Sequence, residues 1–232
     1  MMTRRLFWED MYLKEFQAGV VACEGRRVTL DQTAFNPRGG GLVSDVGTID
    51  GLRVIEVVKE GEDIVHFVDG EPALAKGKPV HGVLDWERRY RIMRMHTAAH
   101  VLSSIVNTET GALITGNQIS PDESRVDFNL EGFDREKMSA YVDKTNQAIG
   151  RGLDVTTFFM KREEALANPG FVKLANAMPP NLDVLRIVKI GDVDTQADGG
   201  VHVQNTREIG RVVALSTDNK GKNNRRLHFT VQ

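Results

Sequence analysis

Several residue types and patterns are scarce in this sequence, and each scarcity excludes a class of protein. One cysteine, Cys23, stands among 232 residues, so internal disulfides are excluded and a reducing cytoplasm is expected. No apolar run approaches the roughly 20 residues of a membrane helix. The N-terminal MMTRRLFWED reaches acidic residues before a signal-like apolar stretch forms. We therefore expect a soluble cytoplasmic protein.

Charge of one sign is also lacking. Lys+Arg number 30 against 32 Asp+Glu, a formal charge of −2, so any nucleic-acid surface must be a local patch. With 41% hydrophobic and 27% charged residues the composition is that of a globular protein. The length predicts one or two domains, each with its own core.

Residues 1–84 carry the pattern of a β domain. Short runs that favour strands cover 19–22, 27–30, 53–58 and 63–68, and turn pairs such as Glu24-Gly25 and Asp69-Gly70 separate them. This density of turns favours a small barrel or a sandwich. His66 alternates with apolar neighbours, so we expect it to face solvent or a partner strand.

The pattern changes at Asp85, where turn residues disappear and helix formers begin. We expect domains over 1–84 and 85–232, the second of them α+β with helices packed on a largely antiparallel sheet. Asp85 and Asp134 are good helix N-caps. The expected helices cover 86–107, 135–149 and 162–167, and the expected strands cover 125–130, 153–160, 184–190, 208–215 and 227–231.

Two histidines stand four residues apart in the first expected helix. His96 and His100 form the pattern H-T-A-A-H. Positions i and i+4 share one helix face, so two imidazoles there can reach one cation. Taken alone, the pattern fits two histidines on a helix surface better.

A second pattern, D-G-G-V-H, joins Asp198 to His202. Two glycines between an acid and a histidine make a tight loop that can aim both side chains inward. Together with the helical histidines they would complete a tetrahedral shell of four ligands. The alternative is a plain turn in which Asp198 caps its own backbone.

The two patterns occur together, in order, in a known family. The segment R-M-H-T-A-A-H-V-L resembles the HxxxH motif of the alanyl-tRNA synthetase editing domain, and Ala197–Gly210 resembles its C-G-G-T-H-V-x-N-T-x-E-I-G motif. Phe35–Gly47 resembles the glycine-rich motif of the same proteins, and Lys220–Leu227 resembles their terminal hairpin. Over essentially the whole chain, the sequence is similar to free-standing editing proteins of the AlaX type, in the medium-length class that keeps an N-terminal barrel.

This resemblance implies one catalytic zinc ion per chain. His96, His100 and His202 match its three histidine ligands, and Asp198 stands where the family usually has cysteine. A carboxylate is a legitimate zinc ligand, but it is harder and less selective for zinc than thiolate. The substitution therefore also admits an empty or differently metallated site.

The resemblance further implies hydrolysis of the ester that joins serine, or in some members glycine, to alanine tRNA. Thr115 and Gln118 follow the metal helix and are candidates for contacting the serine hydroxyl. Two departures, Val201 for threonine and Leu42 for glutamine, leave room for a different substrate preference.

Cationic residues near the expected site are candidates for tRNA phosphates. They are Arg88, Arg89, Arg91 and Arg94 before the metal pair, and Lys220, Lys222, Arg225 and Arg226 near the C-terminus. Gly39, Gly40 and Gly41 would let the backbone approach RNA closely, or form a tight turn. The alternative for both charge runs is an ordinary solvated face.

Three functions follow, from two classes. The first is a zinc-dependent deacylase of mischarged alanine tRNA. The second is a homologue whose metal site is weakened by Asp198 and which binds tRNA or a synthetase without hydrolysis. The third is a zinc hydrolase for another acyl substrate, because a fold does not by itself determine function.

Overall fold

A computed structural model describes residues 2–131, 134–168, 171 and 182–232. The chain divides into two compact units, Met1–Ile92 and Met93–Gln232, and the division falls within helix α2 (Trp86–Thr110). The expected domain boundary at residues 84/85 stays a prediction. Among the described residues, no helix combines the length and the apolar character needed to cross a bilayer.

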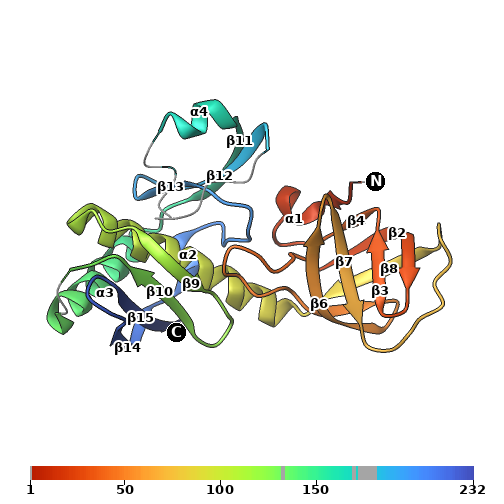
Figure 1. Cartoon of the computed structure of the whole chain (residues 1–232), viewed down its shortest axis with the longest axis horizontal. Coiled ribbons are helices and arrows are strands. Elements are labelled where there is room, and N and C mark those ends of the chain that lie inside the picture. Colours follow the sequence, from red (N-terminus) through yellow and green to blue (C-terminus); the bar gives the residue numbers. More distant parts are fainter. Residues whose placement is uncertain (1, 132–133, 169–170, 172–181) are drawn as a thin grey trace. The chain divides into compact units, whose positions relative to one another are not determined.

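The first unit is built on six antiparallel strands that are hydrogen-bonded in a closed ring, in the order β2-β3-β7-β6-β5-β8 (Figure 1). The ring strands are β2 (Glu15–Glu24), β3 (Arg27–Leu30), β5 (Gly47–Ile49), β6 (Leu52–Glu60), β7 (Asp63–Val68) and β8 (Pro79–Leu84). Outside the ring lie β1 (Arg4–Arg5), α1 (Leu6–Glu9) and β4 (Gln32–Thr33). Alternating side chains such as Val28 and Leu30 are fully buried and form the core inside the ring.

His66, on β7, lies inside this core rather than in solvent. It is 0% exposed and pairs with Val28 on the neighbouring strand β3. Its Nδ1 atom lies 3.0 Å from the Val28 carbonyl oxygen and its Nε2 atom 2.8 Å from the Thr33 hydroxyl. Of the two expected orientations, the one toward a partner strand is correct.

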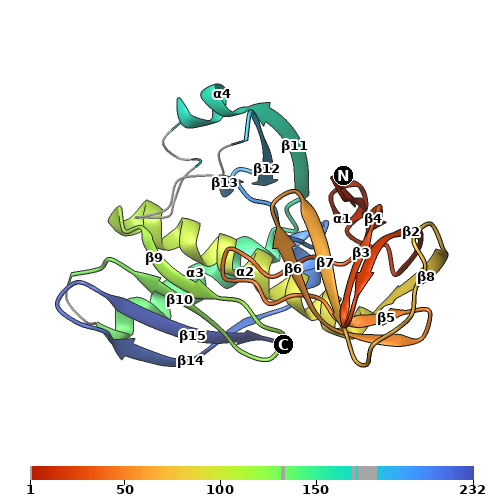
Figure 2. The same ribbon diagram turned by 45° about the vertical axis from the view of Figure 1, so that its right-hand side comes forward.

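The second unit is α+β, as the sequence predicts, with antiparallel pairing throughout its two sheets (Figure 2). One sheet has the order β14-β15-β10-β9 and the other β11-β12-β13. The strands are β9 (Ile114–Gln118), β10 (Ser124–Phe128), β11 (Val155–Lys161), β12 (Val184–Ile190), β13 (Asp194–Ala197), β14 (Val212–Asn219) and β15 (Arg225–Val231). The helices are α2, α3 (Arg135–Gly150) and α4 (Arg162–Leu166).

Both expected N-cap residues accept backbone N–H groups, and the carboxylate of Asp85 accepts that of Arg88 at the start of α2. The carboxylate of Asp134 accepts the backbone N–H groups of Glu136 and Lys137 at the start of α3. One expected strand, 208–215, is wrong at its beginning, because Thr206–Ile209 forms a 3₁₀ helix and β14 begins at Val212. The reason is a capping box. The side chain of Asn205 accepts the backbone N–H of Arg207, and the side chain of Glu208 accepts the backbone N–H of Asn205.

Candidate metal centre

Helix α2 places two histidines side by side in the interior of the second unit. His96 is 4% exposed and His100 7%, and their ring centroids lie 4.8 Å apart. Neighbouring helix residues such as Met95, Ala98 and Leu102 are also buried. Because most of the surface of α2 is buried around the two histidines, the alternative of two solvated histidines on a helix surface is wrong.

The loop after β13 brings the other two residues to the same place. Asp198 Oδ1 accepts the Gly200 N–H at 2.7 Å, so the expected turn, in which Asp198 caps its own backbone, is present. The same carboxylate also faces the histidines. The buried guanidinium of Arg186 donates to the carbonyl oxygens of Asp198 and Gly200 at 3.1 and 2.9 Å, which holds the loop in this shape.

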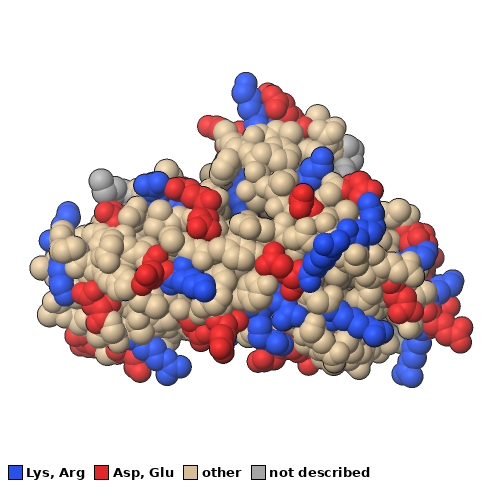
Figure 3. Space-filling model, turned by 180° about the vertical axis from the view of Figure 1, so that it is seen from behind, with Lys and Arg blue, Asp and Glu red and all other residues tan. Residues whose placement is uncertain are grey.

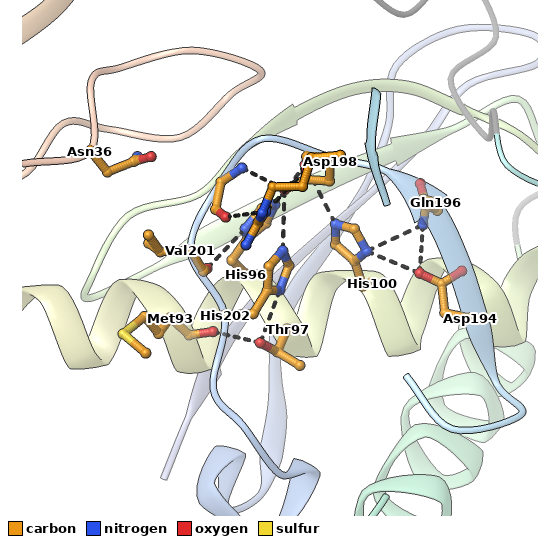
Figure 4. Close-up of polar contacts among 12 residues, drawn as sticks. Asn36, Met93, His96, Thr97, His100, Asp194, Gln196, Asp198, Val201 and His202 are labelled. Atoms are coloured by element: carbon orange, nitrogen blue, oxygen red, sulfur yellow. Dashed lines mark hydrogen bonds and ion pairs between the residues drawn. The ribbon is translucent and has the colours of Figure 1, made fainter. Parts of the chain in front are cut away.

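Four potential ligand atoms converge in this cluster, which consists of His96, His100, Asp198 and His202 (Figure 4). They all lie within 4.8 Å of one another. Oδ2 of Asp198 is 3.6 Å from Nε2 of His96 and 3.9 Å from Nε2 of His100. Oδ1 of Asp198 is 3.2 Å from Nε2 of His202. The four side chains could hold one metal ion.

The outer nitrogens of the helical histidines show why a cation fits here. His96 Nδ1 lies 3.2 Å from the Val201 carbonyl oxygen, and His100 Nδ1 lies 2.9 Å from Asp194 Oδ2. Both of these oxygens only accept hydrogen bonds, so each Nδ1 carries a hydrogen and, in the neutral ring, Nε2 is bare and turned inward. The amide nitrogen of Gln196 also lies 3.4 Å from His100 Nδ1, but it donates to Asp194 Oδ2 at 2.8 Å. Lone pairs then face the Asp198 carboxylate with no hydrogen between them, which is favourable only around a cation.

The pKa values in the cluster favour the forms that bind metals. Burial, together with the neighbouring His202, holds the pKa of His96 well below its usual value. Burial also lowers the pKa of His202 to about 4. The imidazoles of His96 and His202 are therefore neutral near neutral pH, which is the form that binds a metal ion.

Comparison with known proteins agrees with this geometry. A family model described as threonyl and alanyl tRNA synthetase second additional domain matches residues 185–228. The alanyl-tRNA editing protein AlaX-M of Saccharolobus solfataricus is 44% identical over 237 residues that cover 100% of each chain. The AlaX-M protein of Methanosarcina barkeri is 43% identical over 241 residues, 99% of each chain. The chain belongs to the AlaX-M family. An alanine–tRNA ligase of Ignicoccus hospitalis is 37% identical over 93% of this chain but only 24% of the ligase.

Within this AlaX-M family member, the two candidate serine contacts lie on strand β9. Thr115 is exposed, and its hydroxyl donates to Asn224 Oδ1 at 3.1 Å. Gln118 is exposed and accepts from Arg125 Nε at 3.4 Å. Asn224 and Arg125 belong to the sheet and its turns rather than to the metal cluster, so the role of Thr115 and Gln118 in substrate binding stays a prediction.

Two of the arginines expected to contact RNA are buried. Arg89 is 0% exposed and donates to Asp45 Oδ1 at 2.9 Å and to the Ala34 carbonyl oxygen at 2.5 Å. Arg225 is 4% exposed and donates to Asn219, Gly221 and Lys222 in the β14–β15 turn, at 2.6 to 3.0 Å. Both guanidiniums bond within the fold, and phosphate contact by Arg89 and Arg225 stays a prediction.

The other candidate cations are at least partly accessible. Arg94 donates to the Ile209 carbonyl oxygen at 2.7 Å, and Arg226 forms two bonds of 2.7 and 2.8 Å with Asp127. Lys220 and Lys222 are exposed. The remaining two, Arg88 and Arg91, are half-buried. Figure 3 shows basic and acidic groups interspersed over one face.

The glycine run forms a tight turn. Gly39 and Leu42 exchange both backbone hydrogen bonds, at 3.1 and 2.9 Å. Gly40 and Gly41, the two central residues, have φ of +58° and +90°, which residues with a Cβ rarely adopt. The turn is exposed while Leu42 is buried, so its backbone is accessible.

Sequence reasoning missed Asp194, Arg186 and Thr97. Asp194 bonds to His100 from 94 residues away, and no spacing in the sequence pairs the two. Thr97 lies inside the H-T-A-A-H motif, between the candidate ligands, and its polar character in an otherwise buried stretch was an available signal.

Proposed function

We propose that this protein hydrolyses the ester that joins a wrongly attached amino acid to alanine tRNA, in the cytoplasm and in trans to the synthetase. Serine is the principal amino acid in this proposal and glycine the second. One observation carries it: a buried cluster of three imidazoles and a carboxylate, in a chain that matches alanyl-tRNA editing proteins over its full length. The closed ring of strands in the first unit fits the small β-barrel of the medium-length class.

His96, His100, Asp198 and His202 would hold one zinc ion per chain, since imidazole nitrogens and carboxylate oxygens are ordinary zinc ligands. A zinc ion in such a site polarises a carbonyl oxygen or lowers the pKa of a water molecule toward ~7. The protein's own part is to hold the imidazoles neutral and oriented. Val201 and Asp194 do so from the outer side of the two helical histidines.

Selection of serine over alanine requires a group that pairs with the serine hydroxyl. Thr115 and Gln118 are the candidates, and their exposure on β9 supports the proposal. The Thr115 hydroxyl already donates to Asn224, which leaves its oxygen able to accept from serine. A site built around such a bond rejects the analogue that lacks it.

Phosphate contact is proposed for Arg88, Arg91, Arg94, Lys220, Lys222 and Arg226, with Arg89 and Arg225 omitted because they are buried. The exposed turn at Gly39–Gly41 is a further candidate for close approach of RNA. The salt dependence of tRNA binding measures these contributions.

The deciding experiment measures release of radiolabelled serine from purified Ser-tRNA(Ala), with Ala-tRNA(Ala) as the matched substrate. We expect release that stops with chelator and returns with zinc. His96→Ala should lose both zinc and activity, whereas His228→Ala should keep both, because His228 pairs with Glu123 outside the cluster.

The use of aspartate where the family has cysteine supports a second candidate, a non-catalytic module that binds tRNA or a synthetase. Binding of Ser-tRNA(Ala) without release of serine, at saturating zinc, would favour that candidate. Release from other acyl esters but not from Ser-tRNA(Ala) would favour a hydrolase with a different substrate.

A further inference from the structure

Thr97 occupies the position between the two helical histidines, and its hydroxyl has three neighbours. It is 0% exposed. Its Oγ1 atom lies 2.8 Å from the Met93 carbonyl oxygen and 3.1 Å from Nδ1 of His202 (Figure 4). It also lies 3.2 Å from the backbone nitrogen of Val203. A hydroxyl has one hydrogen to donate and can accept two.

The geometry assigns that hydrogen. The Met93 carbonyl can only accept, and two oxygens 2.8 Å apart without a hydrogen between them repel each other. The hydroxyl therefore donates to Met93 and must accept from its other two neighbours. The Val203 N–H is one of them, and the other is an N–H at Nδ1 of His202.

We propose that Thr97 is a positioning residue that keeps His202 in the tautomer with hydrogen on Nδ1 and a bare Nε2 facing Asp198. His202 is 0% exposed and lies on a loop, so no helix turn sets the direction of its ring. Asp198 alone would favour hydrogen on Nε2, which lies 3.2 Å from Oδ1. The Thr97 hydroxyl reverses that preference and gives His202 the same inward lone pair that His96 and His100 have.

This inference rests on the proposed metal site, and metal affinity tests it without any tRNA. Thr97→Val keeps the shape of the side chain and removes the acceptor. We expect zinc affinity, measured by competition with a chromogenic chelator, to fall roughly 10–100-fold, the usual effect of losing an outer partner of a metal-bound histidine. Thr97→Ser restores the hydroxyl and should keep affinity within about threefold.

Thr145 in helix α3 provides the matched control. It is also 0% exposed, and its hydroxyl donates to the carbonyl four residues earlier, Tyr141, at 2.8 Å. Thr145→Val removes the same kind of buried hydroxyl without touching the cluster. It should lower the thermal stability of the metal-free protein by no more than Thr97→Val does, because one hydrogen bond is lost rather than three, and leave zinc affinity unchanged.

A second measurement reads the tautomer directly. ¹⁵N shifts of His202 in the metal-free wild type, assigned through His202→Gln, should show a protonated Nδ1 and a bare Nε2, and Thr97→Val should lose that preference. Hydrogen on Nε2 in the wild type would overturn the proposal, as would a Thr97→Val protein that binds zinc as tightly as wild type. A wild type that binds zinc but releases no serine would refute the deacylase function and leave this assignment intact.

Discussion

The guanidinium of Arg89 and the carboxylate of Asp45 form an ion pair that is shielded from solvent inside the first unit, with side-chain exposures of 0% and 2%. Arg89 also donates to the carbonyl oxygens of Ala34 and Met11. Asp45 in turn accepts the backbone N–H of Asn36 at 2.6 Å and donates its own to Asn36 at 3.0 Å. The pair therefore closes the base of the segment 36–45, which carries the glycine turn.

Removing one partner of this pair leaves an uncompensated buried charge. Arg89→Met should destabilise the protein by about 3–5 kcal/mol in urea unfolding, the usual cost of breaking a buried ion pair. Arg91→Met, a change at a half-buried arginine two residues along the same helix, is the control and should cost much less. Equal effects of the two changes would mean that the Arg89–Asp45 pair does not anchor the segment.

His66 should make the first unit sensitive to acid. Burial lowers the pKa of His66 from 6.5 to about 4, so the folded form holds a neutral ring while the unfolded chain takes up a proton below pH 6.5. Stability from this residue is present above pH 6.5 and falls as pH decreases toward 4, by roughly 3 kcal/mol in total.

The measurement is urea unfolding between pH 7 and 4 with chelator present, for wild type and His66→Gln. The variant should be less stable at pH 7, because the bonds to Val28 and Thr33 change, but should lose less stability on acidification. Parallel pH profiles for the two proteins would refute a buried neutral His66.

Two substitutions test whether Asp198 is a direct zinc ligand. If Asp198 is the fourth ligand, an oxygen of its carboxylate should lie about 2.0–2.2 Å from a bound zinc ion. Asp198→Cys should then retain one zinc per chain and bind it more selectively against manganese, because thiolate is softer. Asp198→Ala should hold zinc more weakly without unfolding, since the three imidazoles still converge.

Elemental analysis and chelator competition check these outcomes, and a zinc-bound crystal structure supplies the distance. Oxygens of Asp198 beyond about 3 Å from the zinc would contradict direct ligation. Asp198→Ala with unchanged zinc affinity would do the same.

The two exposed lysines of the β14–β15 turn should act on tRNA through charge alone. Lys220→Ala with Lys222→Ala should weaken binding of uncharged alanine tRNA and flatten its dependence on salt, by up to ~0.9 in slope for each phosphate that the protein no longer neutralises. Lys137→Ala with Lys144→Ala in helix α3 is a matched pair of exposed lysines in the same unit and should change neither quantity. If the salt dependence of tRNA binding is unchanged in the turn variant, the β14–β15 turn is an ordinary solvated surface.

Hydrophobic periodicity, turn residues and helix N-caps in the sequence predicted many of the helices and strands of the fold. Asp134 caps α3 as its position predicts, and the dense turns of the first 84 residues indicated four of the six ring strands, three of them close to their observed bounds. The ring strands β5 and β8 were not predicted. The H-T-A-A-H spacing placed His96 and His100 on one helix face, and the resemblance to the editing family joined them to Asp198 and His202 as one candidate metal site. The 3₁₀ helix at 206–209 was missed because the reciprocal Asn205–Glu208 cap outweighed the strand pattern.

Only the tertiary structure decided which polar side chains are buried and what they bond to. Arg89 and Arg91 are neighbours in one charge run, yet Arg89 is enclosed with Asp45 while Arg91 stays partly accessible. Asp194 and Thr97 meet histidines that are 94 and 105 residues away in the chain. Such pairings depend on how sheets and helices pack over long sequence separations, where neither spacing nor composition leaves a signal, so the tautomers of the histidines were decided by the fold.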